Sequence, residues 1–174
     1  MSAISLSFTE FRMRVVAGAQ GAQRSETPDQ LLALDPGETT GWAFFSAGVL
    51  TSSGQLATRT IAESILEVDK LIKHLFAWHS TAPAPARMIV FEDYKIYAWK
   101  TDQHTWASLH TPQLLGVIET LALVLGIETR RQMAMHPKQF CTDDKLKMWG
   151  YYVKGQRHAR DAIRHGCYYL LFGK

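Results

Sequence analysis

The sequence predicts an α/β protein built on a mixed five-stranded sheet that is flanked by helices. Two observations support this prediction. Apolar runs at residues 31–35 and 41–46 flank a Pro-Gly turn, and a weaker run follows at 48–56, which together indicate an antiparallel meander. Further along the chain, helical and strand-like patterns alternate, as they do in βαβ crossovers between parallel strands. Hairpins followed by crossovers give one sheet with both strand directions.

The remaining elements follow from periodicity and from breaker residues. Residues 60–79 carry apolar side chains at helical spacing and predict a helix. Residues 81–86 predict a stiff linker, because proline cannot continue a helix. After that linker the sequence predicts a buried strand at 87–93, an apolar helix at 111–126 with Gly126 as its C-cap, a strand at 127–132 and a final helix at 157–172.

Composition limits the class of protein. The chain has 174 residues, of which 47% are hydrophobic, enough for one globular domain with a substantial core. No apolar run approaches the ~18 residues that a membrane-spanning helix needs, so no membrane partner is expected. Cys141 and Cys167 lack a CxxC spacing, which argues against a disulfide framework or a structural zinc site. We therefore expect two core cysteines and a cytoplasmic protein of a bacterium or of a phage-infected cell.

The first 30 residues differ in character from the rest. Residues 4–8 alternate like a strand, residues 11–18 are basic, and residues 17–30 have the composition of a flexible linker. The segment lacks the continuous apolar core of a secretory signal. The sequence thus predicts residues 1–30 as a flexible extension or a mis-assigned start, and residues 31–174 as the folded domain.

Charge is distributed unevenly along the chain. Residues 130–174 hold ten of the 19 Lys and Arg residues but only three of the 16 Asp and Glu residues. A basic C-terminal third fits a polyanionic ligand. A solvated helical face fits the same pattern, so charge alone does not decide between the two interpretations.

Acidic residues end two of the buried strands. Asp35 and Glu92 follow apolar runs, and sites in α/β sheets form at the carboxyl ends of strands. Asp-Pro-Gly is also ordinary turn chemistry. Two carboxylates at one edge repel each other unless a cation lies between them. His158 and Asp161 are spaced i, i+3 and share one helix face. Such an oxygen-rich set with one imidazole suits Mg²⁺ or Mn²⁺ better than zinc.

Several motifs resemble one known family. Residues 31–172 resemble the RuvC-like Holliday-junction resolvases of the ribonuclease-H-like superfamily, especially the small phage-type members. The stretches that carry the resemblance are "LDPGETTGWA", "IVFED" and "HARDAIRH", with "LLGVIETLALVLGIE" and "HPKQFCTDDKLKMWG" between the last two. The resemblance implies a ribonuclease-H-like fold and a homodimeric crossover junction endodeoxyribonuclease that cleaves branched DNA. It also implies two divalent ions, Mg²⁺ or Mn²⁺, held by the catalytic residues Asp35, Glu92, His158 and Asp161.

Two groups of side chains are candidates for DNA contacts. The first consists of basic residues that suit phosphate groups: Lys138, Lys145, Lys147, Lys154, Arg157, Arg160 and Arg164. The second consists of aromatic residues after Glu92 that suit stacking on unpaired bases, or that cover the edge of the core: Tyr94, Tyr97, Trp99 and Trp106. The apolar helix 111–126 is the candidate for the dimer contact, and packing against the sheet explains it equally well.

Other functions compete with this hypothesis. The stretch "DPGETTG" resembles the phosphate-binding turn of sugar kinases and actin-type ATPases, but those proteins need two such domains and a second glycine-rich loop. A nuclease acting on flaps, forks or RNA–DNA hybrids shares the fold and the chemistry, so the sequence separates it poorly. A non-catalytic DNA-binding module needs none of the four site residues, all of which are present. No small-molecule cofactor is expected.

Overall fold

The computed structural model describes residues 7–18, 27–76, 85–94 and 109–173. Its elements are α1 (Phe8–Gly18), β1 (Gln30–Asp35), β2 (Thr39–Ser46), β3 (Val49–Ala57), α2 (Ile61–Leu75), β4 (Arg87–Glu92), α3 (His110–Val124), β5 (Glu128–Gln132), α4 (Met135–Phe140), α5 (Asp143–Met148) and α6 (Arg157–Phe172). The five strands form one sheet in the order β3-β2-β1-β4-β5. The predicted mixed sheet is confirmed: β1 to β3 are antiparallel, whereas β1, β4 and β5 run parallel.

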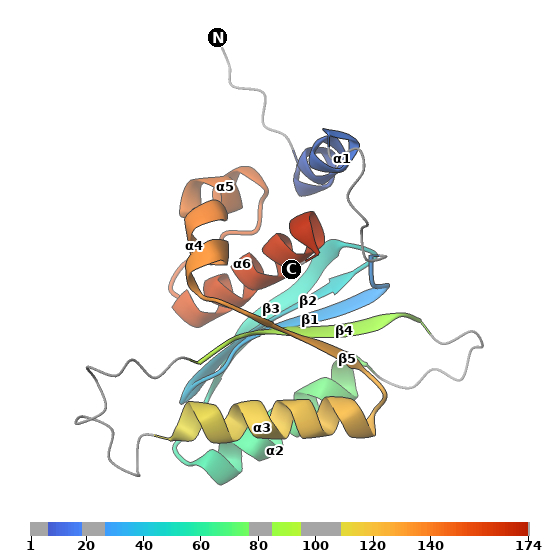
Figure 1. The fold of residues 1–174 in the computed structure, drawn as a ribbon. Helices are drawn as coiled ribbons and strands as arrows, with labels where there is room; N and C mark the ends of the chain where they lie inside the picture. The colour runs from blue at the N-terminus through green and yellow to red at the C-terminus, as the bar shows by residue number, and fades with distance from the viewer. Residues whose placement is uncertain (1–6, 19–26, 77–84, 95–108, 174) are drawn as a thin grey trace.

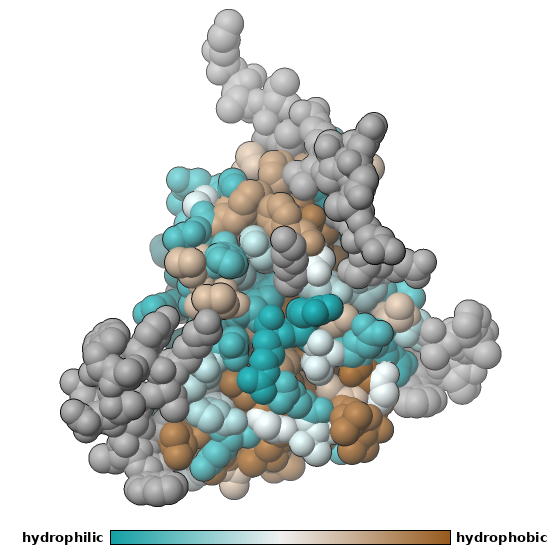
Figure 2. All heavy atoms as spheres, in the orientation of Figure 1, coloured by the Kyte–Doolittle hydropathy of each residue, from teal (hydrophilic) through white to brown (hydrophobic). Residues whose placement is uncertain are grey.

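Helices cover both faces of this sheet, as Figure 1 shows. Helices α2 and α3 lie on one face, and α4, α5 and α6 lie on the other, with α1 above them. Burial on both faces explains why β1 and β4 are apolar almost without interruption rather than alternating. Figure 2 shows a hydrophobic area of the surface in the layer that contains α1, α4, α5 and α6. Within the described ranges, no helix combines the length and the apolar character needed to cross a membrane.

The alternation of side chains along the strands determines which way the acids point. In β1, Leu31 and Ala33 belong to the core beneath α6, whereas Leu32 and Leu34 face α2 and α3. Met88 and Val90 of β4 face α6 in the same way. Because the period along a strand is two, the acids that end β1 and β4 fall on the α6 side of the sheet.

Most predicted elements are confirmed, with small corrections at their ends. The last helix spans residues 157–172 as expected. Strand β4 ends at Glu92 rather than Asp93, and α3 is capped by Leu125, with Gly126 following in a left-handed conformation (φ 64°). Helix α2 ends at Leu75, and most of the predicted linker at 81–86 lies outside the described residues. Both cysteines are buried and free, as expected of core residues.

The structure contains a helix, α1, in the segment that was predicted to be flexible. Phe8 is 1% exposed, and its ring lies 5.0 Å from that of Trp149 and 5.4 Å from that of Tyr151. Phe11 packs on Trp149 from the next turn of α1. The prediction of a uniformly flexible extension is therefore wrong for residues 8–18, because an aromatic socket from the C-terminal part of the chain holds this helix. The short helices α4 and α5 were not predicted either.

Candidate active site at the carboxyl ends of the parallel strands

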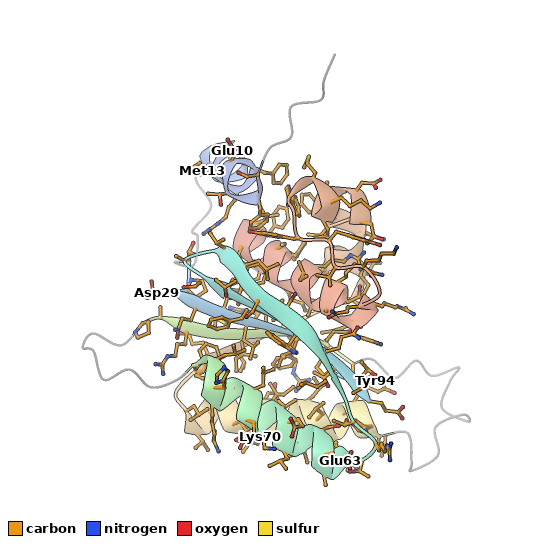
Figure 3. All side chains as sticks on the ribbon, turned by 180° about the vertical axis from the view of Figure 1, so that it is seen from behind. Glu10, Met13, Asp29, Glu63, Lys70 and Tyr94 are labelled. Atoms are coloured by element: carbon orange, nitrogen blue, oxygen red, sulfur yellow. The ribbon has the colours of Figure 1, made fainter. Side chains whose placement is uncertain are left out.

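The two strand-terminal acids lie on neighbouring strands. Strands β1 and β4 are parallel, and their register pairs Leu34 with Phe91, the residues just before Asp35 and Glu92. The chain thus presents both carboxylates at one edge of the sheet. Figure 3 labels Tyr94, two residues beyond Glu92, at this edge, and Asp29, the residue before β1, at the opposite edge.

Helix α6 contributes the imidazole and the third carboxylate. Its first turn approaches β2 so closely that a Cβ on Gly41 would lie 2.0 Å from the carbonyl oxygen of His158. The side chain of Gln55 on β3 accepts a hydrogen bond from the His158 backbone nitrogen (2.9 Å), which satisfies one of the open donors at the helix start. The Nδ1 atom of His158 then lies 2.7 Å from Oδ2 of Asp35. Asp161 follows one turn later and is 5% exposed.

Lys138 lies among these carboxylates. Helix α4 brings its ammonium nitrogen to 2.9 Å from Oε2 of Glu92 and 3.4 Å from Oδ2 of Asp161. Burial opposes the charge on Lys138, but the hydrogen bond to Glu92 and the nearby negative charges raise its pKa above the usual value. The sequence assigned Lys138 to DNA phosphates. In the structure its partners are two of the predicted site residues.

The two strand-terminal acids have pKa values shifted in opposite directions. Burial, reinforced by the negative charge of Glu92, raises the pKa of Asp35 to about 6, although the hydrogen bond with His158 lowers it. Burial alone would also raise the pKa of Glu92, but hydrogen bonds from His165 and Lys138 lower it to about 2. One carboxylate is thus stabilised as an anion while its neighbour resists ionisation. Paired acids with separated pKa values are typical of functional sites.

Sequence reasoning missed two residues at this site, His165 and Gln132. His165 is fully buried on α6, with Nε2 at 3.1 Å from Oε2 of Glu92 and Nδ1 at 2.8 Å from Oε1 of Gln132. Gln132 ends β5, which pairs with β4 so that Gln132 and Glu92 are direct partners. The spacing i, i+4 from Asp161 to His165 was the available signal, because it places both side chains on one helix face.

Some of the other basic residues predicted to contact phosphates are bound within the protein, and others are exposed. Arg164 binds Asp161, Asp143 and the carbonyl of Cys141, and the Nη1 of Arg160 donates to the carbonyl of Val153. The ammonium of Lys145 donates to the Phe140 carbonyl, and that of Lys147 pairs with Asp144. Arg157 and Lys154 are exposed and have no ion-pair partner in the described part of the chain.

Of the four aromatic residues predicted to reach DNA, only one is described. Tyr94 is partly buried and packs against the core formed with α2 and α3. This placement fits the alternative interpretation, in which some of these aromatics cover the core edge. Tyr97, Trp99 and Trp106 lie outside the described residues, so their stacking role stays a prediction.

The residues at this edge have the chemistry that a hard divalent cation prefers. The predicted set consists of the carboxylates of Asp35, Glu92 and Asp161 and the imidazole of His158, and oxygen-rich sets of this kind suit Mg²⁺ or Mn²⁺. Among the described residues, however, no three His, Cys, Asp or Glu side chains are already arranged as a ligand shell. The positive charge near Glu92 and Asp161 is that of Lys138. The donor set therefore fits a metal ion, and side chains must rearrange around it.

The fold is similar to the ribonuclease-H-like fold of solved RuvC-type Holliday junction resolvases. RuvC of T. thermophilus, solved in complex with a Holliday junction substrate, superposes with a TM-score of 0.62 at 13% identity, covering 83% of this chain and 94% of that chain. A second structure of Thermus thermophilus RuvC gives a TM-score of 0.58 at 14% identity, over 83% of this chain and 95% of that one.

A eukaryotic resolvase shares the same fold. The yeast mitochondrial Holliday junction resolvase Ydc2 gives a TM-score of 0.54 at 11% identity, over 93% of this chain and 84% of that chain. No family model matches the sequence, and no curated protein matches it either. The arrangement of the sheet and helices is thus similar to that of these proteins, although the sequence identity is low.

Proposed function

We propose that this chain is a metal-dependent, structure-selective DNA endonuclease that cleaves four-way junctions, with residues 31–174 as its nuclease domain. One observation carries the proposal. Three acids and one imidazole from β1, β4 and α6 meet at the carboxyl ends of parallel strands, in a fold whose solved neighbours include a RuvC bound to a Holliday junction. Their chemistry supports phosphodiester hydrolysis assisted by divalent cations.

Each residue of the cluster has a role in this proposal. Asp35, Glu92, His158 and Asp161 would hold Mg²⁺ or Mn²⁺. When bound, such ions supply an activated water and the positive charge that stabilises the departing oxygen. In the structure Lys138 contacts Glu92 and Asp161, and a cation held by these carboxylates would compete with its ammonium group for them. Once displaced, the ammonium group can face a DNA phosphate, as its residue type suggests.

Arg157 and Lys154 are the strongest candidates for DNA contacts outside the cluster. They are exposed, and no ion pair with another described residue occupies their charges. Both lie at or just before the start of α6, next to His158. Phosphate contacts from such residues give affinity without sequence readout. Tyr97 and Trp99 complete the proposal as the readers of unpaired bases.

A homodimer is also proposed, since two opposed strands of a junction must be cut. Helix α3 buries Leu114, Leu115 and Ile118 against the sheet, which explains most of its apolar character. At its C-terminal end, however, Leu123 and Val124 are 81% and 77% exposed. These two side chains are the candidate dimer contact on α3.

Cleavage of a synthetic four-way junction tests the proposed function. Labelled junction, flap, fork, RNA–DNA hybrid and linear duplex would be incubated with the protein and Mg²⁺, with EDTA and the Asp35→Asn variant as controls. We expect paired cuts in the junction, weak cutting of the duplex, and none in either control.

The same set of DNA substrates distinguishes junction cleavage from the alternative functions. Preference for a flap, a fork or a hybrid would indicate another nuclease of this fold. Tight junction binding without cleavage in Mg²⁺ and in Mn²⁺ would indicate a non-catalytic DNA-binding module. In either case the claim of junction resolution would be withdrawn.

A further inference from the structure

His165 is a polar residue on the buried side of α6. It has no exposed surface, and Ala162 and Tyr169, one turn before and after it on the helix, are buried too. Burying an imidazole costs free energy unless its nitrogens are hydrogen-bonded. An aliphatic residue would fill this position at lower cost, so packing alone does not explain the histidine.

Both nitrogens of His165 are engaged, and by different strands. Nδ1 contacts the Gln132 amide at the end of β5, and Nε2 contacts Glu92 at the end of β4. An amide can present either its oxygen or its NH₂ group. Because Glu92 is an acceptor, Nε2 must carry the hydrogen that it donates to Oε2. In the neutral ring Nδ1 is then bare, and the Gln132 amide satisfies it by presenting its NH₂ group.

The contacts of Glu92 are confined to one of its oxygens. His165 and Lys138 both reach Oε2, at 3.1 Å and 2.9 Å. No described residue donates a hydrogen bond to the other oxygen, Oε1. The donors on α6 and α4 fix the rotation of the carboxylate, with Oε1 directed away from them. Oε2 is therefore held by hydrogen bonds, and Oε1 is available to bind a cation.

We propose that His165, held in place by Gln132, is a positioning residue that fixes Glu92 for binding a divalent cation. This inference rests on the proposed function, in which Glu92 is a metal ligand. When Lys138 leaves Glu92 for a DNA phosphate, His165 is the remaining donor to Oε2. The orientation of Glu92 then depends on His165 alone among the described side chains.

Two measurements on the DNA-free protein test this role. The first is the Mn²⁺ dissociation constant by calorimetry, and the second is the pKa of Glu92 by ¹³C NMR without metal. His165→Leu keeps the volume but removes the donor, and we expect Mn²⁺ affinity to fall about 10–100-fold and the pKa of Glu92 to rise. His165→Gln places an amide near the Nε2 position, so it should recover most of the affinity.

A matched control and a second variant separate loss of the hydrogen bond to Glu92 from a general loss of folding. Cys167→Ala alters an equally buried position on α6 that does not touch Glu92, and it should change neither measurement. If His165→Leu does not fold, Gln132→Leu removes the partner of Nδ1 and should weaken Mn²⁺ binding by a smaller factor. Wild-type values for both measurements in the folded variants would overturn the proposal. Failure of His165→Gln to recover any affinity would overturn it too.

The positioning role of His165 and the proposed nuclease function can fail independently of each other. A wild-type protein that binds Mn²⁺ through Glu92 but cuts no junction would refute the nuclease and leave the positioning role intact. If the wild type binds no Mn²⁺, the cation-positioning proposal is overturned together with the metal-dependent function. A rise in the pKa of Glu92 would then show only the hydrogen bond itself.

Discussion

The Nδ1 atom of His158 lies 2.7 Å from Oδ2 of Asp35, although 123 residues separate the two in sequence. This contact joins the first turn of α6 to the last residue of β1. It also brings a titratable imidazole against a carboxylate whose pKa burial has raised to about 6. Ionising Asp35 therefore costs free energy in the folded protein, and changes at Asp35 or at His158 should alter both stability and cleavage.

Asp35→Asn should abolish cleavage and raise the stability of the metal-free protein at neutral pH. The pKa of Asp35 is raised from 3.8 to about 6, so between these values the folded protein binds more protons than the unfolded chain. Stability therefore falls as pH rises through this window, and the cost persists above pH 6. Removing the charge should recover on the order of 2 kcal/mol at pH 8.

Thermal denaturation in EDTA at pH 8 and pH 4 measures this difference. We expect the variant to melt at a higher temperature than the wild type at pH 8, with the gain vanishing at pH 4. Cleavage within tenfold of the wild-type rate would instead identify Asp35 as a turn residue.

His158→Asp should retain substantial cleavage, whereas His158→Ala should lose most of it. A carboxylate can replace an imidazole as a ligand of a hard cation, and a methyl group cannot. In the metal-free protein, the new carboxylate would repel Asp35 at short range. The His158→Asp variant should therefore melt at a lower temperature in EDTA and gain more than the wild type from added Mg²⁺.

Cleavage rates and melting curves of both variants, with and without Mg²⁺, check this prediction. His74→Ala, an exposed histidine on α2 across the sheet, is the control and should behave like the wild type. Equal cleavage by the Asp and Ala variants would make His158 a bystander.

Gly41→Ala should destabilise the protein and displace α6. The added Cβ would lie 2.0 Å from the carbonyl oxygen of His158, which is backbone and cannot rotate away. We expect a loss of about 3 kcal/mol or more, typical of severe overpacking. Chemical denaturation of Gly41→Ala and of Gly116→Ala provides a matched pair of measurements.

Gly116 lies on α3, and apart from its chain neighbours and the backbone of its own helix, no atom of the described residues comes within 4 Å of the place that a Cβ would occupy there. Alanine at this position should stabilise the helix by roughly 0.5–1 kcal/mol. Similar effects at the two glycines would show that α6 does not pack on β2 as described.

Phe8→Ala should destabilise the domain, because Phe8 fills the socket formed by Trp149 and Tyr151. Truncating a buried phenylalanine costs about 3 kcal/mol or more when the cavity does not collapse. Met13, labelled on α1 in Figure 3, is 59% exposed, so Met13→Ala should stay within about 0.5 kcal/mol of wild type. Melting temperatures of both variants measure how much the packing of α1 contributes to stability. An unchanged melting temperature for Phe8→Ala would contradict the packing of α1 on the domain and favour a flexible extension.

Arg157→Gln should weaken DNA binding uniformly across sequences. Losing one phosphate contact should reduce the slope of log affinity against log salt by about one. Binding titrations at several salt concentrations, with Lys73→Gln on α2 as the control, measure the slope. If the slopes match, the DNA path does not pass the start of α6.

Local patterns were sufficient to predict the sheet and to suggest four residues of the candidate site. Strands β1 and β4 are apolar because both faces of the sheet are covered, and their terminal acids follow from the two-residue period. The placement of His158 and Asp161 on one face of a helix follows from the helical period. Signals of this kind depend only on neighbours in the chain, so the sequence alone reveals them.

The packing of distant elements determines which charges meet. By composition, Lys138 belongs with the other basic residues of the C-terminal third, yet it lies beside Glu92, 46 residues away. His165 contacts Glu92 across 73 residues, and Gln132 gave no local signal at all. Phe8 was assigned to a flexible segment because the aromatic rings that hold it come from the other end of the chain. Such contacts depend on how whole elements pack across the sheet, and periodicity within one element carries no information about its distant partners.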